Sequence, residues 1–226
     1  MLSLDVARYN MTCPPIVLES LWFESGGGVC NAPDSLGAFV SEAKSCSRCG
    51  LSYERVNDPV VSSGSVDAQV AVVGRSPFVD EDASGELGTS GWYRDMVEEV
   101  YLKPLGVSVD STYFTNTVFC FPKGGRDLVE EDCDPCCEIF KAAEFSLLKL
   151  LKVVLLLGQN AARSVIDPGF AIWKHYGATI SVRGVLYVPV FNPVTLVRNR
   201  YLEDLVRYQM GIIRGRVSFF RQGVLA

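Results

Sequence analysis

The sequence lacks any long apolar run, since none approaches the roughly 20 residues that a membrane-spanning helix needs. It also lacks the pattern of a secretory signal, a basic segment followed by an apolar one. The first residues carry acidic side chains such as Asp5 and Glu19 instead. We therefore expect a soluble, intracellular protein with no membrane partner.

Histidine and basic charge are both scarce. His175 is the single histidine, lies outside every motif described below, and is expected to have a surface or structural role. Lys and Arg number 21 against 26 Asp and Glu, for a formal net charge of -5. This charge argues against a general nucleic-acid binder, because phosphate neutralisation needs basic residues, although a local groove can still be basic.

Eight cysteines, at positions 13, 30, 46, 49, 120, 133, 136 and 137, indicate a metal site. In an intracellular chain, a close pair plus a distant cluster favours metal binding over a disulfide framework. Cys46 and Cys49 can hold one metal centre from a turn. Cys120 and Cys136 would complete a four-thiolate set suited to zinc or to an iron–sulfur cluster. The alternative is that several of these cysteines are buried apolar residues.

Apolar runs alternate with amphipathic ones after a first segment, residues 1–40, that has no sustained periodicity. We interpret 1–40 as an N-terminal extension and 41–226 as one domain. The expected strands are Val70–Val73, Tyr113–Cys120, Val153–Leu157 and Val185–Phe191. The expected helices are Trp92–Tyr101, Glu130–Leu151, Asn160–Val165 with Asn160 as N-cap, and one from about Tyr201. This alternation predicts the α/β class: a three-layer α/β/α fold around a central, mostly parallel, four-stranded sheet.

Ligands of such sheets bind beyond the carboxyl ends of the strands. The sequence therefore places four segments around one crevice: 74–82, 116–126, 158–160 and 192–198.

Three of these segments carry candidate chemistry, each with a structural alternative. Glu81 follows a strand in a tight loop that can hold a carboxylate over a ligand, or it belongs to an acidic surface turn. Asn116 offers the donor and acceptor needed to read a nucleobase edge, or it is a structural cap. Residues 192–198, ending in Arg198, suit insertion into a duplex and a phosphate contact, or form a strand-to-helix turn.

Taken in order over residues 43–210, these segments resemble family 4 uracil-DNA glycosylases, the iron–sulfur branch of the uracil-DNA glycosylase superfamily. Matches to the family's first loop motif are Gly74, Pro77, Glu81, Asp82, Gly85, Gly88 and Gly91. Matches to its second strand motif and the arginine after it are Thr115, Asn116, Val118, Cys120, Pro122 and Arg126. The last motif, H-P-x-x-L-L-R-N in the family, reads Asn192-Pro193-Val194-Thr195-Leu196-Val197-Arg198-Asn199.

The resemblance implies a DNA glycosylase that flips uracil or a related base out of DNA and hydrolyses its N-glycosidic bond in base-excision repair. It implies base contacts from Asn116, Phe78, Gly74 and Arg75, and phosphate contacts from Arg198 and Gly158. It implies catalytic roles for Glu81, which orients water or stabilises positive charge on the sugar, and for Asn192, which faces the leaving base. It implies a structural 4Fe–4S cluster held by Cys46, Cys49, Cys120 and Cys136, with Cys133 as the alternative fourth ligand and zinc as the alternative metal.

Three positions depart from the family's pattern. Arg75 stands where the family has Glu, and Phe78 stands where a small Gly lets the backbone approach the base. Asn192 replaces the His that stabilises the departing uracil anion in the family. An amide can still donate a hydrogen bond there, and losing one such donor costs about a hundred- to a thousandfold in rate.

These departures leave alternatives to an active uracil glycosylase. One is a catalytically inactive glycosylase fold that serves as a DNA-binding or replication-associated subunit. A second is a glycosylase for another modified base, and a third is a zinc-bound structural protein with no DNA role. We expect a monomer that binds DNA and replication or repair proteins, in the cytoplasm or nucleoid, or in the host cell if the source is viral.

Overall fold

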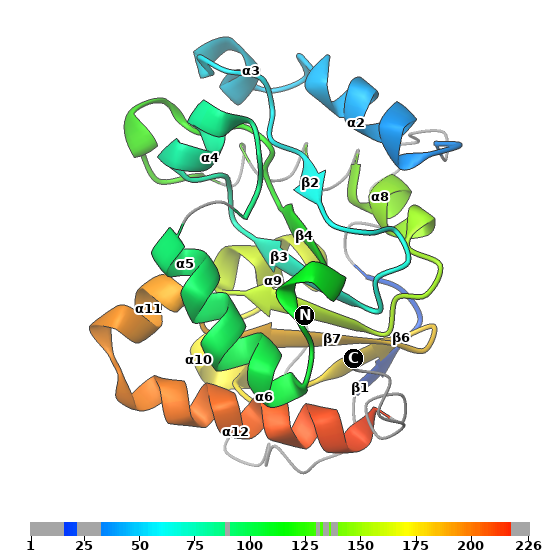
Figure 1. Ribbon diagram of the computed structural model, residues 1–226, viewed down its shortest axis with the longest axis vertical. Helices are drawn as coiled ribbons and strands as arrows, with labels where there is room; N and C mark the ends of the chain where they lie inside the picture. Colours follow the sequence, from blue (N-terminus) through cyan, green and yellow to red (C-terminus); the bar gives the residue numbers. More distant parts are fainter. Residues whose placement is uncertain are drawn as a thin grey trace.

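Four parallel strands form the centre of the fold (Figure 1). Across the sheet they are β7 (Val185–Val190), β5 (Val153–Leu157), β3 (Val70–Gly74) and β4 (Thr112–Asn116). The computed structural model describes residues 16–21, 33–88, 91–129, 132, 136 and 140–217. The four strands are those expected from the sequence. The exception is the end of β4, which leaves the sheet after Asn116, whereas the sequence predicts a strand as far as Cys120.

Three short strands widen this sheet. At one edge β6 (Ile180–Val182) pairs antiparallel with β7, and β1 (Ile16–Leu18) pairs parallel with β6. At the other edge β2 (Ser62–Ser63) pairs antiparallel with β4. The described residues thus form a seven-stranded sheet, and the predicted number of four was wrong. Strands of two or three residues are too short to show the alternation that marks a strand in a sequence.

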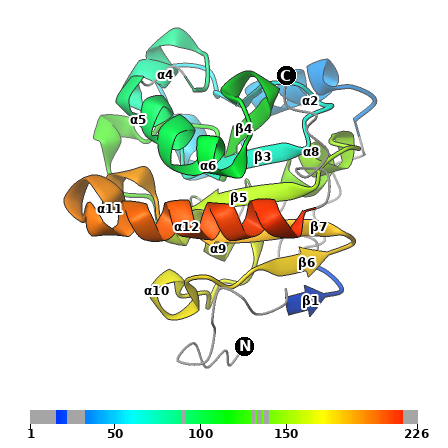
Figure 2. The same ribbon diagram turned by 60° about the horizontal axis from the view of Figure 1, so that its bottom comes forward.

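Helices cover both faces of the sheet, which confirms the three-layer class (Figure 2). On one face, α5 (Gly91–Met96), the π-helical η2 (Val97–Leu102) and α6 (Lys103–Leu105) follow one another. Of these, η2 and α6 pack against α12 (Tyr201–Arg216). On the other face, α9 (Gln159–Val165) contacts β5 and β7. Every residue of β3 and β5 is buried, as expected for strands covered on both sides.

Two predicted helices differ from the structure at their ends. The helix expected over Glu130–Leu151 was too long, since the described part of this region has α8 at Ala142–Leu147 and leaves helical geometry at Leu148. Asn160 is not an N-cap, because α9 already begins after Gly158. None of the helices in the described ranges is long and apolar enough to cross a membrane.

Part of the predicted N-terminal extension lies against the domain. β1 joins the sheet edge, and Leu21 is buried in the main core. Phe39, in α2 (Leu36–Lys44), packs edge-on against Phe119 and Phe140. The domain boundary at residue 41 stays a prediction.

Candidate functional site

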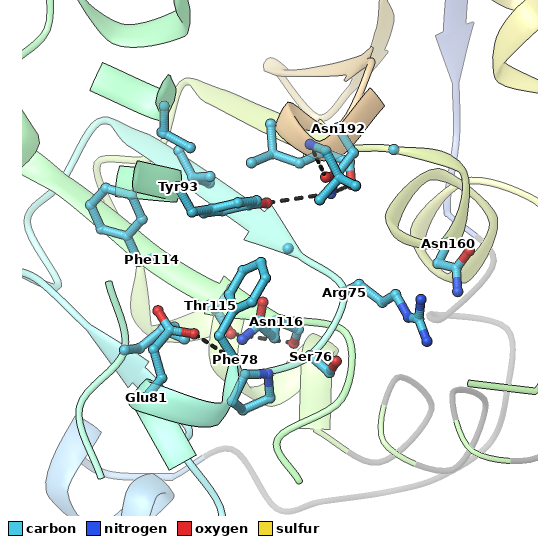
Figure 3. Close-up of a pocket in the computed structure, with 18 of the residues that line it drawn as sticks. Arg75, Ser76, Phe78, Glu81, Tyr93, Phe114, Thr115, Asn116, Asn160 and Asn192 are labelled. Carbon is cyan, nitrogen blue, oxygen red and sulfur yellow. Dashed lines mark hydrogen bonds between the residues drawn. The ribbon is translucent and has the colours of Figure 1, made fainter. Parts of the chain in front are cut away.

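A cavity of about 640 Å³ lies beyond the carboxyl ends of the four central strands (Figure 3). All four segments expected around the crevice contribute to its lining. The predicted site residues that line it are Gly74, Arg75, Phe78, Glu81, Asn116, Gly158 and Asn192. Arg198 is not among the lining residues and is exposed at the end of α11 (Pro193–Arg198).

Asn116 presents an unpaired amide to this cavity. It ends β4 in register with Gly74 of β3, and it is only 5% exposed. A Cβ at position 74 would lie 2.2 Å from the Asn116 Oδ1, so only glycine leaves room for the amide. The Asn116 Nδ2 is buried and has no hydrogen-bond partner in the described structure. Because such a donor is costly to leave unpaired, it is suited to a ligand acceptor.

Glu81 holds two loop segments together at the cavity wall. It lies in α4 (Val79–Ser84) and is buried. Its Oε2 accepts from the Phe78 N–H at 2.9 Å, and its Oε1 accepts from the Gly88 N–H at 2.6 Å. A carboxylate accepts up to about four hydrogen bonds, so Glu81 can also accept from a water or face a positive charge in the cavity.

Arg75 is tethered to the loop after β4. Its Nη1 pairs with Asp127 Oδ1 at 2.9 Å, and its Nη2 donates to the Arg126 carbonyl at 3.4 Å. In Figure 3 the guanidinium points toward Asn160 and away from Tyr93. The Arg75 guanidinium therefore lies outside the space between Tyr93 and Asn116, where Figure 3 shows the ring of Phe78.

Both the oxygen and the nitrogen of the Asn192 side-chain amide are hydrogen-bonded within the protein. As N-cap of α11, its Oδ1 accepts from the Val194 N–H at 2.9 Å. Its Nδ2 donates to the Leu157 carbonyl at 3.2 Å and to the Tyr93 hydroxyl at 3.3 Å. Gly158, with φ at +93°, makes this approach possible, because a Cβ there would lie 2.9 Å from the Asn192 Cβ.

Aromatic rings form the wall next to Asn192. The Phe78 and Tyr93 ring centroids are 4.7 Å apart, and Trp92 contacts both rings edge-on. Burial raises the pKa of the Tyr93 hydroxyl well above its ordinary value, and the charge of Glu81 adds to this increase. Tyr93 is not predicted from the sequence as a site residue, because the apolar spacing of residues 92–101 indicates only a helix.

Three of the four cysteines expected to bind a metal pack together in the structure. Cys120 and Cys136 are buried in one cluster, and Cys49, the N-cap of α3 (Gly50–Glu54), packs against it. Burial raises the pKa of the Cys120 thiol to about 11, against the opposing effect of Arg55 beside it. Cys46 is half-buried nearby, and Cys133 lies outside the described residues.

An ion-pair hub joins the segments that carry these cysteines. Arg126 follows Cys120, and its guanidinium bonds Asp132 at 2.6 and 3.0 Å. The same guanidinium bonds Glu54, at the end of α3, at 3.2 Å. The hub therefore connects the helix after Cys49 to the regions of Cys120 and Cys136.

A buried polar network lies beside the strand that ends in Asn116. Lys141 and Glu144 are fully buried and form an ion pair. Lys141 also donates to Thr115 Oγ1 at 2.8 Å, and the Tyr113 hydroxyl donates to Glu144 Oε1 at 3.0 Å. Both hydroxyls belong to β4, so the network braces the strand that positions Asn116.

His175 has the structural role expected of it. It is buried, its Nδ1 accepts from the Ala171 N–H, and its ring packs against Phe170. It does not line the cavity, so it cannot replace the histidine that is absent at position 192.

Comparison with known proteins gives one family and several relatives. The family model described as "Uracil DNA glycosylase superfamily" matches residues 61–208. A "Type-4 uracil-DNA glycosylase" of Thermotoga maritima is 30% identical over 194 residues, which are 84% of this chain and 97% of that protein. Proteins of the same name from Archaeoglobus fulgidus and Saccharolobus solfataricus are 29% and 24% identical, over 68% and 82% of this chain and 73% and 88% of their own lengths.

Proposed function

The chain belongs to the uracil DNA glycosylase superfamily, and we propose that it excises uracil from DNA by hydrolysing the N-glycosidic bond, which opens base-excision repair. The observation that carries this proposal is the buried, unpaired Nδ2 of Asn116 in a cavity at the carboxyl ends of the central strands. The carbonyl oxygens of uracil are acceptors for such a donor once the nucleotide is flipped out of the DNA. The relatives named type-4 uracil-DNA glycosylase support the same substrate.

Base recognition would rest on residues from two adjacent strand ends. Asn116 would bind the polar edge of the base, and Gly74 would keep the space beside that amide free. Phe78 offers its ring for stacking. Arg75, which lines the same cavity, would contact the base or its phosphate after its guanidinium releases Asp127, because the one unpaired nitrogen, Nε, is buried.

Catalysis would use the charge of Glu81 and the polar group at Asn192. Cleavage places positive charge on the sugar and negative charge on the departing base. The Glu81 carboxylate, fixed by two backbone N–H groups, would stabilise the sugar and orient the attacking water. Asn192 would act at the opposite end of the base, where the negative charge develops.

Contact with the DNA backbone would come from α11. Arg198 is exposed, and its side chain makes no hydrogen bond or ion pair with another described residue. Val194 and Val197 expose apolar surface on the same helix, as suits a segment that displaces a base from the stack. Gly158 would contribute by leaving the backbone accessible, since its own N–H already donates to the Val190 carbonyl.

The cofactor proposed is a structural 4Fe–4S cluster. Its ligands would be Cys46, Cys49, Cys120 and Cys136, with Cys133 as the alternative fourth. The Nη1 of Arg55 is buried without a partner beside Cys120, and the sulfur atoms of an anionic cluster would accept from it. In the described ranges no three His, Cys, Asp or Glu side chains are arranged to hold one metal ion. An iron–sulfur cluster needs the four sulfur atoms less close together than a single zinc ion does, because each thiolate binds a different iron atom.

The proposed activity is tested by uracil release from single-stranded and U·G duplex DNA, with enzyme in excess and protein purified without oxygen. We expect release by the parent chain and its loss in Asn116→Ala. The control Ser111→Ala, which removes an exposed hydroxyl outside the cavity, should retain the activity. A parent chain that binds DNA and releases no uracil would contradict the proposal. Brown colour would distinguish an iron–sulfur cluster from colourless zinc.

One observation favours a second candidate, an inactive DNA-binding subunit. Both hydrogens of the Asn192 amide are engaged within the protein, so this amide is not free to reach the base. The same assay separates the candidates, because the inactive subunit would bind uracil-containing DNA without releasing the base. Release of a modified base in place of uracil would instead indicate a shifted specificity.

We also propose a monomer that works inside the cell, in the cytoplasm or nucleoid, with DNA and with replication or repair proteins. DNA as the partner is supported by the name uracil-DNA glycosylase that the relatives share. Mass measurement in solution tests the oligomeric state.

A further inference from the structure

Asn192 stands at the position of the expected electrophile, yet its amide has no hydrogen left to donate. An amide nitrogen carries two hydrogens, and the Asn192 Nδ2 has two acceptors, the Leu157 carbonyl at 3.2 Å and the Tyr93 hydroxyl at 3.3 Å. Its oxygen is held by the Val194 N–H. Stabilisation of the leaving base therefore requires another donor.

The Tyr93 hydroxyl has a hydrogen available for donation, which the Asn192 amide does not. Since an amide nitrogen only donates, the Tyr93 oxygen is the acceptor in their shared bond, and its own hydrogen is directed elsewhere. No acceptor for that hydrogen is found in the described part of the chain. Tyr93 lines the cavity together with Asn116, and Figure 3 shows its hydroxyl between Asn192 and the side where Phe78 and Asn116 lie.

We propose that Tyr93 is the catalytic donor to the departing uracil, and that Asn192 is a positioning residue that acts through it. This inference rests on the proposed glycosylase function. The bond between C1′ and the base nitrogen breaks with both electrons leaving on the base. Water adds to C1′ and loses a proton to Glu81, which returns it to solvent. Tyr93 donates a hydrogen bond to the anionic base and keeps its proton.

The surroundings of Tyr93 suit a fixed, neutral donor. Phe78, 4.7 Å away between ring centroids, and Trp92, 5.6 Å away, hold the ring in place. Burial and the nearby Glu81 charge raise its pKa, so the hydroxyl stays protonated at neutral pH. Tyrosine hydroxyls are among the donors that stabilise developing oxyanions in other enzymes.

The first test compares single-turnover uracil release by the parent chain, Tyr93→Phe and the control Tyr208→Phe, which removes an exposed hydroxyl from α12. Tyr93→Phe should slow release by about a hundred- to a thousandfold, the usual cost of one such donor, and the control should match the parent. Affinity for DNA with a non-hydrolysable uridine analogue should not change. The Tyr93→Phe deficit should shrink with 5-fluorouracil, whose less basic anion needs the donor less. An equal deficit for both bases would indicate a structural role and overturn the proposal.

The second test uses Asn192→Asp. Aspartate can still cap α11, but it accepts the Tyr93 hydrogen and so turns the donor away from the base. We expect a loss at least as large as that of Tyr93→Phe, because the carboxylate also repels the anionic base, and no further loss when Tyr93→Phe is added to Asn192→Asp, because the donor is already turned away. If the losses of the two single variants multiply in the double variant, or if Tyr93→Phe is fully active, Tyr93 is not the donor, while the proposed glycosylase function stands. No release by the parent chain would overturn both.

Discussion

Arg126 and Asp132 form a two-bonded ion pair, with Nη1–Oδ2 at 2.6 Å and Nη2–Oδ1 at 3.0 Å, between the segments of Cys120 and Cys136. We predict that Arg126→Met loosens the proposed cluster site, because Asp132 and Glu54 then lose their common partner. The visible absorbance of the purified protein should decay faster in air than that of the parent chain. An unchanged decay would show that the cysteines need no such support. Arg94→Met, which removes an exposed arginine elsewhere, serves as the control.

Gly74→Ala should displace the Asn116 amide. The added Cβ would lie 2.2 Å from Oδ1, a distance that real atoms do not adopt, so the amide must move. A displacement of about 1 Å costs on the order of a hundredfold in rate. Single-turnover release measures this, with Gly211→Ala as control, since a Cβ at 211 meets nothing within 4 Å. Equal activity in both variants would contradict the proposed role of Asn116.

Gly158→Ala should reduce both stability and activity. Its backbone, with φ at +93° and ψ at -179°, lies in a region that is essentially restricted to glycine and costs about 1–3 kcal/mol for other residues. The new Cβ would also lie 2.9 Å from the Asn192 Cβ. Gly184 also has a positive φ, but an added Cβ there would meet no atom within 4 Å. Gly184→Ala should therefore reduce stability and leave the activity unchanged. Urea unfolding and uracil release together separate the two effects.

Lys141→Met should destabilise the fold strongly. It leaves Glu144 charged and buried without its partner, and removing one member of such a pair costs about 3–5 kcal/mol. Lys141→Met with Glu144→Gln should recover part of this loss, since no charge is then buried alone. Urea unfolding measures both variants. A surface change, Lys103→Met, should leave the midpoint unchanged.

The fold should lose stability in alkaline solution. Burial raises the pKa of Tyr93 and Tyr176 above the ordinary value of 10.0. Below that pH the folded and unfolded chains both hold these protons, so the contribution is fully present. As pH rises above it, the unfolded chain releases protons that the folded chain keeps, and stability falls. Urea midpoints at about pH 8 and about pH 11 should differ less in Tyr93→Phe than in the parent chain.

The sequence predicts the strands that are written as uninterrupted apolar runs. The apolar runs at 70–73 and 153–157 are buried strands because both faces of the sheet are covered, and the four loops after the central strands meet because parallel strands end at one edge. Seven of the eight predicted catalytic and DNA-contacting residues line one cavity for this reason.

The sequence does not predict contacts that depend on long-range side-chain geometry. Tyr93 and Asn192 are 99 residues apart, and nothing in either segment indicates their hydrogen bond. Lys141 is charged, so a pattern-based interpretation assigns it to solvent, whereas Glu144 one helical turn later makes its burial possible. The outer strands β1 and β6 have three residues each, which is too few to show a strand pattern, and each forms by pairing with a neighbouring strand.

The bond between Asn192 and Tyr93 also has an evolutionary consequence. If histidine replaced asparagine at position 192, it would supply a donor of its own, and a hydroxyl at position 93 would no longer be needed. If Tyr93 were lost first, asparagine at 192 would have no partner through which to act. The two positions should therefore change as a pair in descendants of this chain, even though neither lies within the motif that contains the other.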